Sequence, residues 1–200
     1  MEGEKVFKVR LSSSIMDIDY SKVDKCIKAI LKYKKSGEVL DIGVGNGRNA
    51  LFLSSKGFKV IGIDSDKEMV KKFKQNANKL GLKVVGKQAD IKEYNIGKKF
   101  EIIISTNVLH FLDKRDIKRV IGNIKQHTKK DGINALIVFT EENPDKDYPY
   151  LFKKGELKKY YSDWDIKGYK ELITPFETHQ GKMQPHRHGI AILLAINNKN

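Results

Sequence analysis

The chain has 200 residues, a net charge of +14 and one cysteine, Cys26. Its length fits one domain with a substantial core, and a single cysteine excludes a disulfide framework and a cysteine-based metal cluster. No apolar run approaches the roughly 20 residues of a membrane span, and residues 1–10 carry too many charges for a signal peptide. We therefore expect a cytoplasmic protein with no membrane partner.

The positive charge invites a nucleic-acid partner, but its distribution disfavours one. The lysines are spread along every expected helix and form no single block. We favour a solvated, lysine-rich surface of the kind found in heat-adapted proteins, with a weak attraction for polyanions left open. Arginine, the better bidentate reader of bases and phosphates, occurs only at Arg10, Arg48, Arg115, Arg119 and Arg187.

The N-terminal region precedes the expected core. Residues 1–19 show no clear period and predict a loose arm or lid. From Ser21, which can cap a helix, apolar residues recur on one helical face and predict a flanking helix over residues 20–35. The core is expected over residues 36–196, so the chain 1–200 is predicted to form a single domain.

Residues 38–53 read E-V-L-D-I-G-V-G-N-G-R-N-A-L-F-L and predict a strand, a turn and a helix. The apolar strand 38–42 is followed by glycines at every second position and by a helical patch over 46–56. This order opens a nucleotide-cofactor site in a doubly wound α/β sheet. Glycines suit the turn because they reach unusual backbone angles and let a ligand approach the main chain. The three are Gly43, Gly45 and Gly47.

The spacing of these glycines selects the ligand. In the dinucleotide fingerprint G-x-G-x-x-G, the third glycine packs the helix and the pyrophosphate lies on the helix N-terminus. Here the third glycine comes one residue early, and an acid, Asp41, lies near the end of the strand. The pattern D-x-G-x-G-x-G resembles motif I of class I S-adenosylmethionine-dependent methyltransferases. A tight turn in another α/β protein is the alternative.

A second acid, Asp64, follows the expected strand 59–63. An acid about 20 residues past the glycine turn holds the ribose hydroxyls of a bound adenosine, since one carboxylate accepts from two hydroxyls. The alternative is a helix cap, and both roles are compatible if Ser65 or Asp66 supplies the cap. By the same resemblance, Ile63-Asp64-Ser65 is motif II, so Asp64 and Ser65 are expected at the cofactor.

A third acid, Asp90, follows the expected strand 83–87 and precedes Ile91. This pair resembles methyltransferase motif III, in which the carboxylate takes the adenine amino group and the apolar residue stacks on the ring. Taken alone, Asp90 would more often be a turn or cap residue. The two preceding acids at strand ends favour the ligand role.

The Ile-rich run 100–105 predicts a parallel strand covered on both faces. Loops at the carboxyl ends of such strands line the site, so residues 106–112 are expected beside the transferring methyl group. This segment lacks the Asn-Pro-Pro-Tyr signature of enzymes that methylate base amino groups. The chain also has no Pro-Cys pair for attack on cytosine. Both absences argue against a DNA methyltransferase.

The resemblance to class I methyltransferases implies a Rossmann-like α/β fold. Its doubly wound, mostly parallel, seven-stranded sheet would have the order 3-2-1-4-5-7-6, with strand seven antiparallel. The remaining expected elements fit this fold: a helix capped by Asp113 that ends near 129–132, a strand over 133–140, a short helix around 155–162, and strands over 164–169 and 189–196.

In that topology the last hairpin turns at the carboxyl edge, above the cofactor. Within 185–188, arginine supplies a bidentate fork and histidine a tunable donor for an anionic acceptor. A metal site built from histidines, or a structural role for them, is the alternative. Residues 171–188 are therefore expected over the substrate pocket, including Glu171, Glu177, His179, His186, Arg187 and His188.

Roughly residues 36–196 also resemble the TehB-like tellurite-resistance methyltransferases. The resemblance implies that Arg48 lies near the methionine carboxylate, with a surface salt bridge as the alternative, and that Ser105 and Thr106 border the cofactor. Family members are associated with methylating tellurite or selenium compounds in a polar, arginine-containing pocket. The marks are Gly47-Arg48-Asn49, Ser105-Thr106, residues 152–157, Tyr160-Tyr161, Trp164 and residues 191–195.

The predicted function is methyl transfer from S-adenosylmethionine to a small acceptor, either a metalloid oxyanion or a thiol. Arg187, His186 and His110 are expected to meet the acceptor, and no metal is expected. A base is needed only if the acceptor must lose a proton, which a metalloid lone pair does not require. Two alternatives stay open: an RNA methyltransferase that uses the basic surface, and a non-catalytic regulator that binds the cofactor.

Overall fold

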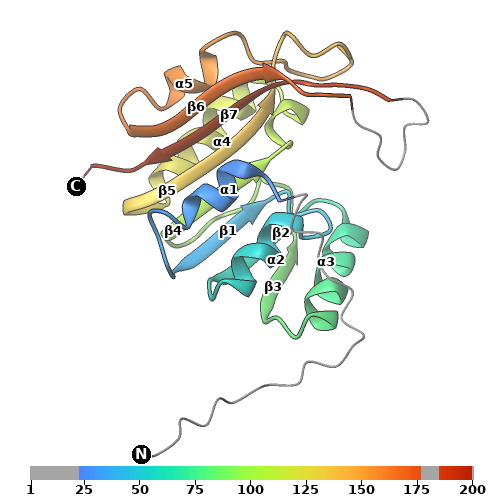
Figure 1. Cartoon of the computed structure of the whole chain (residues 1–200), viewed down its shortest axis with the longest axis vertical. Helices are drawn as coiled ribbons and strands as arrows, with labels where there is room; N and C mark the ends of the chain where they lie inside the picture. Colours follow the sequence, from blue (N-terminus) through green and yellow to red (C-terminus); the bar gives the residue numbers. More distant parts are fainter. Residues whose placement is uncertain (1–22, 177–184, 200) are drawn as a thin grey trace, which may run out of the picture.

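The computed structural model describes residues 23–176 and 185–199, and its seven strands form one sheet. The order β3-β2-β1-β4-β5-β7-β6, with β7 antiparallel to both neighbours, confirms the predicted topology (Figure 1). The strands are β1 (Glu38–Ile42), β2 (Lys59–Asp64), β3 (Val84–Gln88), β4 (Phe100–Thr106), β5 (Thr128–Phe139), β6 (Asp165–Ile173) and β7 (Gly189–Ile196).

Helices cover both faces of the sheet (Figure 1). Apolar side chains of the first three helices pack on one face and those of the last two on the other. Ile103 joins one of these clusters and Ile104 the other, so β4 is buried on both faces as its sequence predicts. The helices are α1 (Lys25–Ile30), α2 (Arg48–Ser55), α3 (Lys67–Lys79), the 3-10 helix η2 (Leu109–Phe111), α4 (Lys114–Gln126) and α5 (Glu156–Tyr160).

Four elements differ most from their predicted bounds. One is α4, which ends at Gln126 because residues 129–132, where it was expected to end, belong to β5. The flanking helix is shorter than 20–35, with Asp24 at its N-cap, while Ser21 and the predicted arm 1–19 lie outside the described residues. β5 begins earlier than expected because Thr128 pairs with Phe100 ahead of an irregularity in the register. β6 continues to Ile173, so the hairpin is shorter than expected.

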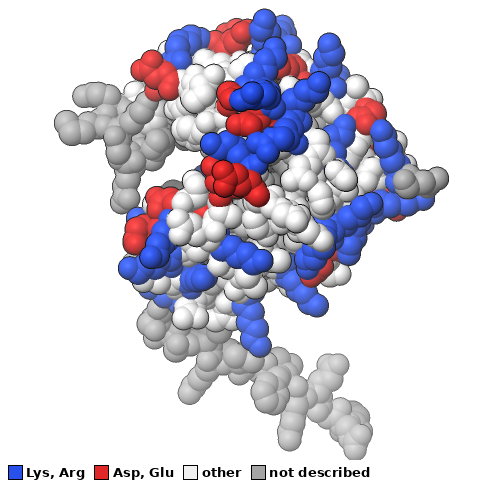
Figure 2. All heavy atoms as spheres, turned by 180° about the vertical axis from the view of Figure 1, so that it is seen from behind, with Lys and Arg blue, Asp and Glu red and all other residues white. Residues whose placement is uncertain are grey.

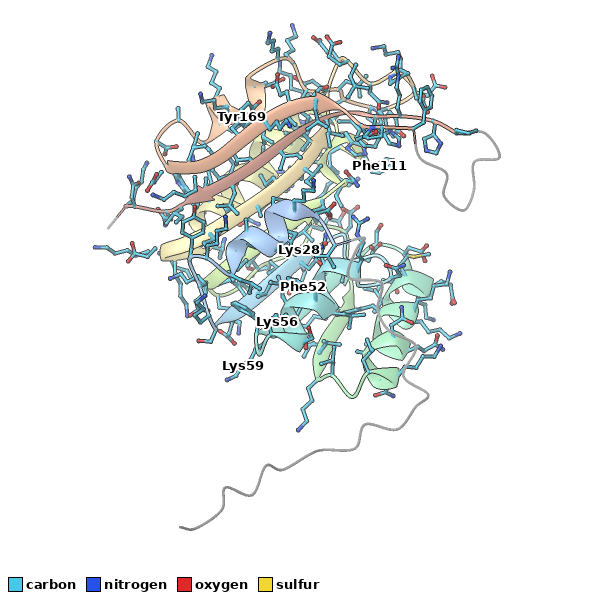
Figure 3. The ribbon with its side chains drawn as sticks, in the orientation of Figure 1. Lys28, Phe52, Lys56, Lys59, Phe111 and Tyr169 are labelled. Carbon is cyan, nitrogen blue, oxygen red and sulfur yellow. The ribbon has the colours of Figure 1, made fainter. Side chains whose placement is uncertain are left out.

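The lysines are spread over many elements. Figure 3 labels Lys28, Lys56 and Lys59, which come from α1, from the C-terminal end of α2 and from β2. The Lys56 ammonium lies 5.6 Å from the centroid of the Phe52 ring, so part of this charge also covers apolar surface. Over the part of the chain that the structure describes, no helix is both long and apolar enough to cross a bilayer.

Candidate functional site

The turn after β1 holds its three glycines at left-handed backbone angles. Gly43, Gly45 and Gly47 have φ values of 73°, 54° and 95°. A Cβ at Gly43 would lie 2.0 Å from Val108 Cγ2, and one at Gly47 would lie 2.4 Å from Phe73 Cδ2. A Cβ at Gly45 would meet nothing within 4 Å. The turn is therefore closely packed at its two outer glycines and open at the middle one.

Asp64 ties the end of β2 to this turn. Its Oδ2 accepts a hydrogen bond from the Gly45 N–H at 2.9 Å, and its Oδ1 accepts from the Asp66 N–H at 3.0 Å. Asp66 caps α3, since its side chain accepts from the N–H groups of Glu68 and Met69. Capping thus falls to Asp66 and leaves Asp64 to the turn. Each carboxylate oxygen has two lone pairs, so Asp64 can still accept from two hydroxyl groups.

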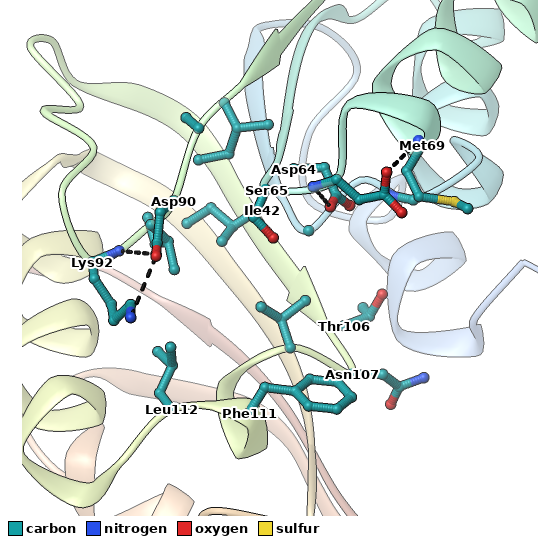
Figure 4. A pocket seen from close by; sticks show the side chains of 17 residues that line it. Ile42, Asp64, Ser65, Met69, Asp90, Lys92, Thr106, Asn107, Phe111 and Leu112 are labelled. Carbon is teal, nitrogen blue, oxygen red and sulfur yellow. Dashed lines mark hydrogen bonds and ion pairs between the residues drawn. The ribbon is translucent and has the colours of Figure 1, made fainter.

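A cavity of about 670 Å³ opens at the carboxyl ends of β1 to β4 (Figure 4). The lining residues that were not assigned a role from the sequence include Met69, Val108, Phe111 and Leu112, although the last three lie in the predicted loop 106–112. Figure 4 shows Asp64 and Asp90 on different walls, with Phe111 and Leu112 along a third. The predicted cofactor residues that line the cavity are Gly43, Gly45, Asp64, Ser65, Asp90, Ile91 and Thr106.

Lys92 contacts the Asp90 carboxylate at the cavity in two ways. The Lys92 N–H donates to Oδ1 at 2.9 Å, and the Lys92 ammonium lies 3.4 Å from Oδ2 (Figure 4). The Asp90 side chain is 41% exposed, so it remains able to accept from a ligand. Ile91, which follows it, is buried and apolar. An acid beside an apolar residue suits an aromatic ring that carries an amino group.

Arg48 lies at the first residue of α2, and its Nη2 lies 2.8 Å from Asp24 Oδ2 in an ion pair. The Asn49 amide donates to the same Asp24 oxygen and to Thr106 Oγ1, so these contacts join the start of α2 to α1 and β4. The contact of Arg48 with a methionine carboxylate stays a prediction. The predicted cofactor residues that do not line the cavity are Asp41, Gly47, Arg48 and Ser105.

Two of these residues are buried polar groups with unused hydrogen-bonding capacity. Asp41 Oδ1 and Ser105 Oγ have no hydrogen-bond partner among the described residues. Asp41 is only 2% exposed, and burial raises its pKa to about 8 although the Arg48 guanidinium opposes the rise. Such groups cost free energy in a folded protein and are retained mainly where they serve a function.

The substitution Asp41→Asn is expected to reduce the pH dependence of the free energy of unfolding. The folded protein keeps a proton on Asp41 up to about pH 8, whereas the unfolded chain releases it near pH 4. The wild type therefore loses stability as the pH rises through this window, by up to roughly 1.4 kcal/mol per pH unit. Asparagine has no proton to lose. Urea unfolding at about pH 5 and about pH 8 measures the effect.

The difference in free energy of unfolding, Asp41→Asn minus wild type, should be more positive at about pH 8 than at about pH 5. An equal difference at both pH values would mean that Asp41 is ionised throughout in the folded protein.

His110 forms a stacked column with Phe139 and His188. The rings of His110 and Phe139 lie 3.8 Å apart and 4° from parallel, and those of Phe139 and His188 lie 4.5 Å apart at 13°. The Phe139 N–H donates to His110 Nδ1 at 3.2 Å, which places the His110 proton on Nε2. That nitrogen has no partner among the described residues. Burial lowers the pKa of His110 to about 3, so the ring is a neutral donor.

The hairpin adds His186 and Arg187 to this region. His186 lies edge-on to His188, with ring centroids 4.9 Å apart, while the Arg187 guanidinium lies 5.4 Å from the centroid of the exposed Phe176 ring. On the other side of the column, His110 contacts Phe111, which lines the cavity. Ring contacts therefore lead from Phe111 at the cavity to His186 in the hairpin, whereas Arg187 contacts Phe176, which is not among these rings.

The hairpin prediction is wrong for Glu171. This residue lies in β6, and its Oε1 accepts from the Gly155 N–H at 2.7 Å and from the Tyr169 hydroxyl. It therefore anchors the loop before α5 and does not lie over the pocket. Glu177 and His179 lie outside the described residues. Within 23–176 and 185–199, no three His, Cys, Asp or Glu side chains are grouped to hold a metal ion.

The strand order and the glycine-lined cavity with acids at the ends of β2 and β3 define the fold and cofactor site of class I S-adenosylmethionine-dependent methyltransferases. Within that class, the family model of the tellurite resistance protein TehB matches residues 15–191. The chain belongs to the TehB family.

Individual relatives agree with this membership. The probable S-adenosyl-L-methionine-dependent methyltransferase TehB of Haemophilus influenzae is 33% identical over 137 residues, which cover 67% of this chain and 48% of the relative. The crystal structure of TehB from Haemophilus influenzae superposes with a TM-score of 0.80 at 27% identity, covering 88% of this chain and 62% of that one.

A ubiquinone biosynthesis O-methyltransferase of Rickettsia prowazekii is 31% identical over 143 residues, covering 72% of this chain and 55% of the relative. This chain thus spans about half the length of the curated relatives it matches.

Proposed function

We propose that this chain transfers a methyl group from S-adenosylmethionine to a small acceptor, either a metalloid oxyanion or a thiol. One observation carries the proposal: the Asp64 carboxylate holds the Gly45 N–H beside a cavity of about 670 Å³ at the carboxyl edge of the sheet. Ligand pockets occupy about 300–1,000 Å³. The cavity is therefore large enough for a nucleoside cofactor, and its polar groups lie where such a cofactor needs them.

The residues present fit S-adenosylmethionine. The open position at Gly45 leaves space next to the main chain, and Asp64 retains lone pairs for ribose hydroxyls. Asp90 and Ile91 offer an acceptor and an apolar surface for the adenine. Asp41 Oδ1 and Ser105 Oγ, which have no partner within residues 23–176 and 185–199, lie near the ends of β1 and β4, where the methionine end would lie. Arg48 would approach the methionine carboxylate from the start of α2.

When bound, the cofactor supplies an activated methyl group on a sulfonium, and transfer is an in-line displacement. The chain then has to hold the acceptor close and aligned. His110 suits this task as a neutral donor, because its Nδ1 is occupied by the Phe139 N–H and its Nε2 carries the proton. In that tautomer His110 cannot accept a proton at Nε2. It therefore orients a lone-pair donor and does not serve as a base.

The acceptor class rests on charge and on the family's name. His186 supplies a tunable donor beside His188, and Arg187, the residue between them in the sequence, supplies a cation, which together suit an oxyanion. A matching family described by tellurite resistance supports a metalloid oxyanion. Incubating the protein with S-adenosylmethionine and tellurite, selenite or simple thiols, and detecting S-adenosylhomocysteine, tests the proposal. A cofactor-binding regulator would form no S-adenosylhomocysteine with any acceptor.

The substitution Arg187→Ala is expected to lower kcat/KM for the anionic acceptor at least about tenfold, because a charge-assisted hydrogen bond is worth roughly 1.5–3 kcal/mol. The affinity for S-adenosylmethionine should stay within about twofold of wild type, since Arg187 does not line the cofactor cavity. Steady-state kinetics and calorimetry measure the two effects.

Arg115→Ala is the matched control. This substitution also removes one arginine side chain. That side chain is 90% exposed, and its ion pair with Asp113 is long, at 4.0 Å, so neither kcat/KM nor the affinity for S-adenosylmethionine should change. Loss of cofactor affinity in the Arg187 variant would place this residue at the cofactor and contradict its proposed role.

A further inference from the structure

Five lysines from three segments line a second groove, which lies outside the cofactor cavity and has a volume of about 640 Å³. Two come from α4, two from the loop before α5 and one from α5. We call it the lysine groove. All five side chains are exposed. Figure 2, which views the face opposite to that of Figure 1, shows basic side chains gathered in the upper part of the molecule, with a few acidic side chains among them. The lysines are Lys114, Lys118, Lys153, Lys154 and Lys159.

The charge of the lysine groove is not neutralised within the described residues. None of its five lysines forms an ion pair there, whereas Lys125 and Lys129 each lie 2.6 Å from a carboxylate oxygen. The one acid of the lining, Glu156, accepts from the Tyr150 hydroxyl at 2.7 Å and from the Lys153 N–H at 2.9 Å. Its carboxylate is therefore held by its own loop. With one carboxylate among five lysines, the lining keeps a net positive charge, and an anionic partner relieves the repulsion among the lysines.

Aromatic rings accompany these lysines. Tyr160 lines the groove, and Lys114 lies 5.8 Å from the centroid of the Tyr150 ring. Lysines that follow a backbone of phosphates, together with rings on which bases stack, are the features of single-strand nucleic-acid binding. Lysine supplies point charges without the bidentate geometry that arginine uses to read bases. The composition favours a phosphate backbone bound without regard to sequence.

We infer that the lysine groove binds single-stranded RNA through its phosphates, independently of which acceptor is methylated. The groove begins at Lys114, two positions after Leu112, which lines the cofactor cavity. A strand in the groove would therefore pass close to the mouth of the active site. The sequence hides this surface because its lysines come from separate segments that only the fold brings together.

Fluorescence anisotropy tests the inference. It measures the binding of a labelled oligouridylate of about 12 nucleotides at several salt concentrations. Neutralising five phosphates on a single strand predicts a slope of log K against log salt of about −3.5. The triple variant Lys118→Gln/Lys153→Gln/Lys154→Gln should bind at least about tenfold more weakly, with a slope shallower by about 2.

The control variant Lys67→Gln/Lys71→Gln/Lys74→Gln removes the same net charge from α3, where these lysines border a different groove. It should keep the wild-type slope within about 0.5 and the affinity within about threefold. Since all six lysines are exposed, both variants should have the melting temperature of the wild type. Equal losses in the two variants would show a diffuse attraction of the net charge and would overturn the inference.

Tyr160→Ala separates RNA from an acidic polypeptide. Loss of one stacked base predicts at least about a fivefold weaker affinity for oligouridylate with an unchanged salt slope. Poly-glutamate should compete only weakly, since it has no bases to stack. Competition by poly-glutamate equal to that by oligouridylate would assign the groove to an acidic polypeptide and overturn the inference. An unchanged affinity of Tyr160→Ala, in a variant with the wild-type melting temperature, would show that no base stacks on this ring and would overturn it as well.

Discussion

Replacing Gly43 with alanine is expected to abolish measurable binding of S-adenosylmethionine and to lower the free energy of unfolding by about 2–5 kcal/mol. The residue has φ of 73°, which an L side chain rarely adopts. The new Cβ would also lie 2.0 Å from Val108 Cγ2, and Val108 lines the cofactor cavity. Relieving that clash requires either the turn or Val108 to move, and both movements distort the cavity. Calorimetric titration and urea unfolding measure the two losses.

Gly57→Ala is the control for backbone strain alone. This glycine has φ of 90°, but a Cβ there would meet nothing within 4 Å. The variant should lose only about 1–2 kcal/mol of stability and keep its cofactor affinity. Wild-type cofactor affinity in the Gly43 variant would contradict the role of this turn.

The sheet was predictable because its signals are local and physical. The apolar run of β4 indicates a strand covered on both faces, and the side chains on its two faces do pack into two separate clusters. The turn after β1 was predictable from the spacing of its three glycines, all of which have positive φ. The strand order, in contrast, came from resemblance to a known class, since no pattern within a single strand tells which neighbour it pairs with.

The carboxyl-edge site was predicted in part. Acids at the ends of β2 and β3 line the cavity because parallel strands end at one edge of a sheet. The hydrogen bond from Gly45 to Asp64 was not predictable, since it depends on the conformation of the turn. The buried position of Asp41 and the tautomer of His110 likewise depend on tertiary packing.

The errors arise where pairing overrides local pattern. Glu171 was placed in the hairpin because the preceding strand was expected to end at residue 169, but pairing with β7 carries β6 past it, and its carboxylate accepts from the Gly155 N–H. β5 begins at Thr128 because of pairing with Phe100, which the lysine-rich start of the strand conceals. In both cases the deciding partner is distant in sequence.

The second large effect is expected for Asp64→Ala. This change removes the acceptor of the Gly45 N–H, which holds the glycine turn, together with the proposed acceptor of the ribose hydroxyls. Hydrogen bonds to a charged group are worth roughly 1.5–3 kcal/mol each, so losing two should weaken cofactor binding at least about 100-fold. Asp113→Ala is the matched control, because it removes an acid that caps α4 and does not line the cavity. That variant should lose about 1 kcal/mol of stability and keep its cofactor affinity.

The most direct test of the cofactor site is therefore calorimetric titration of the wild type, Asp64→Ala and Asp113→Ala with S-adenosylmethionine. We expect one cofactor per chain for the wild type and for Asp113→Ala, with a Kd at least about 100-fold higher for Asp64→Ala. Binding by Asp64→Ala within about threefold of wild type would remove this carboxylate from the site and contradict the placement of the cofactor.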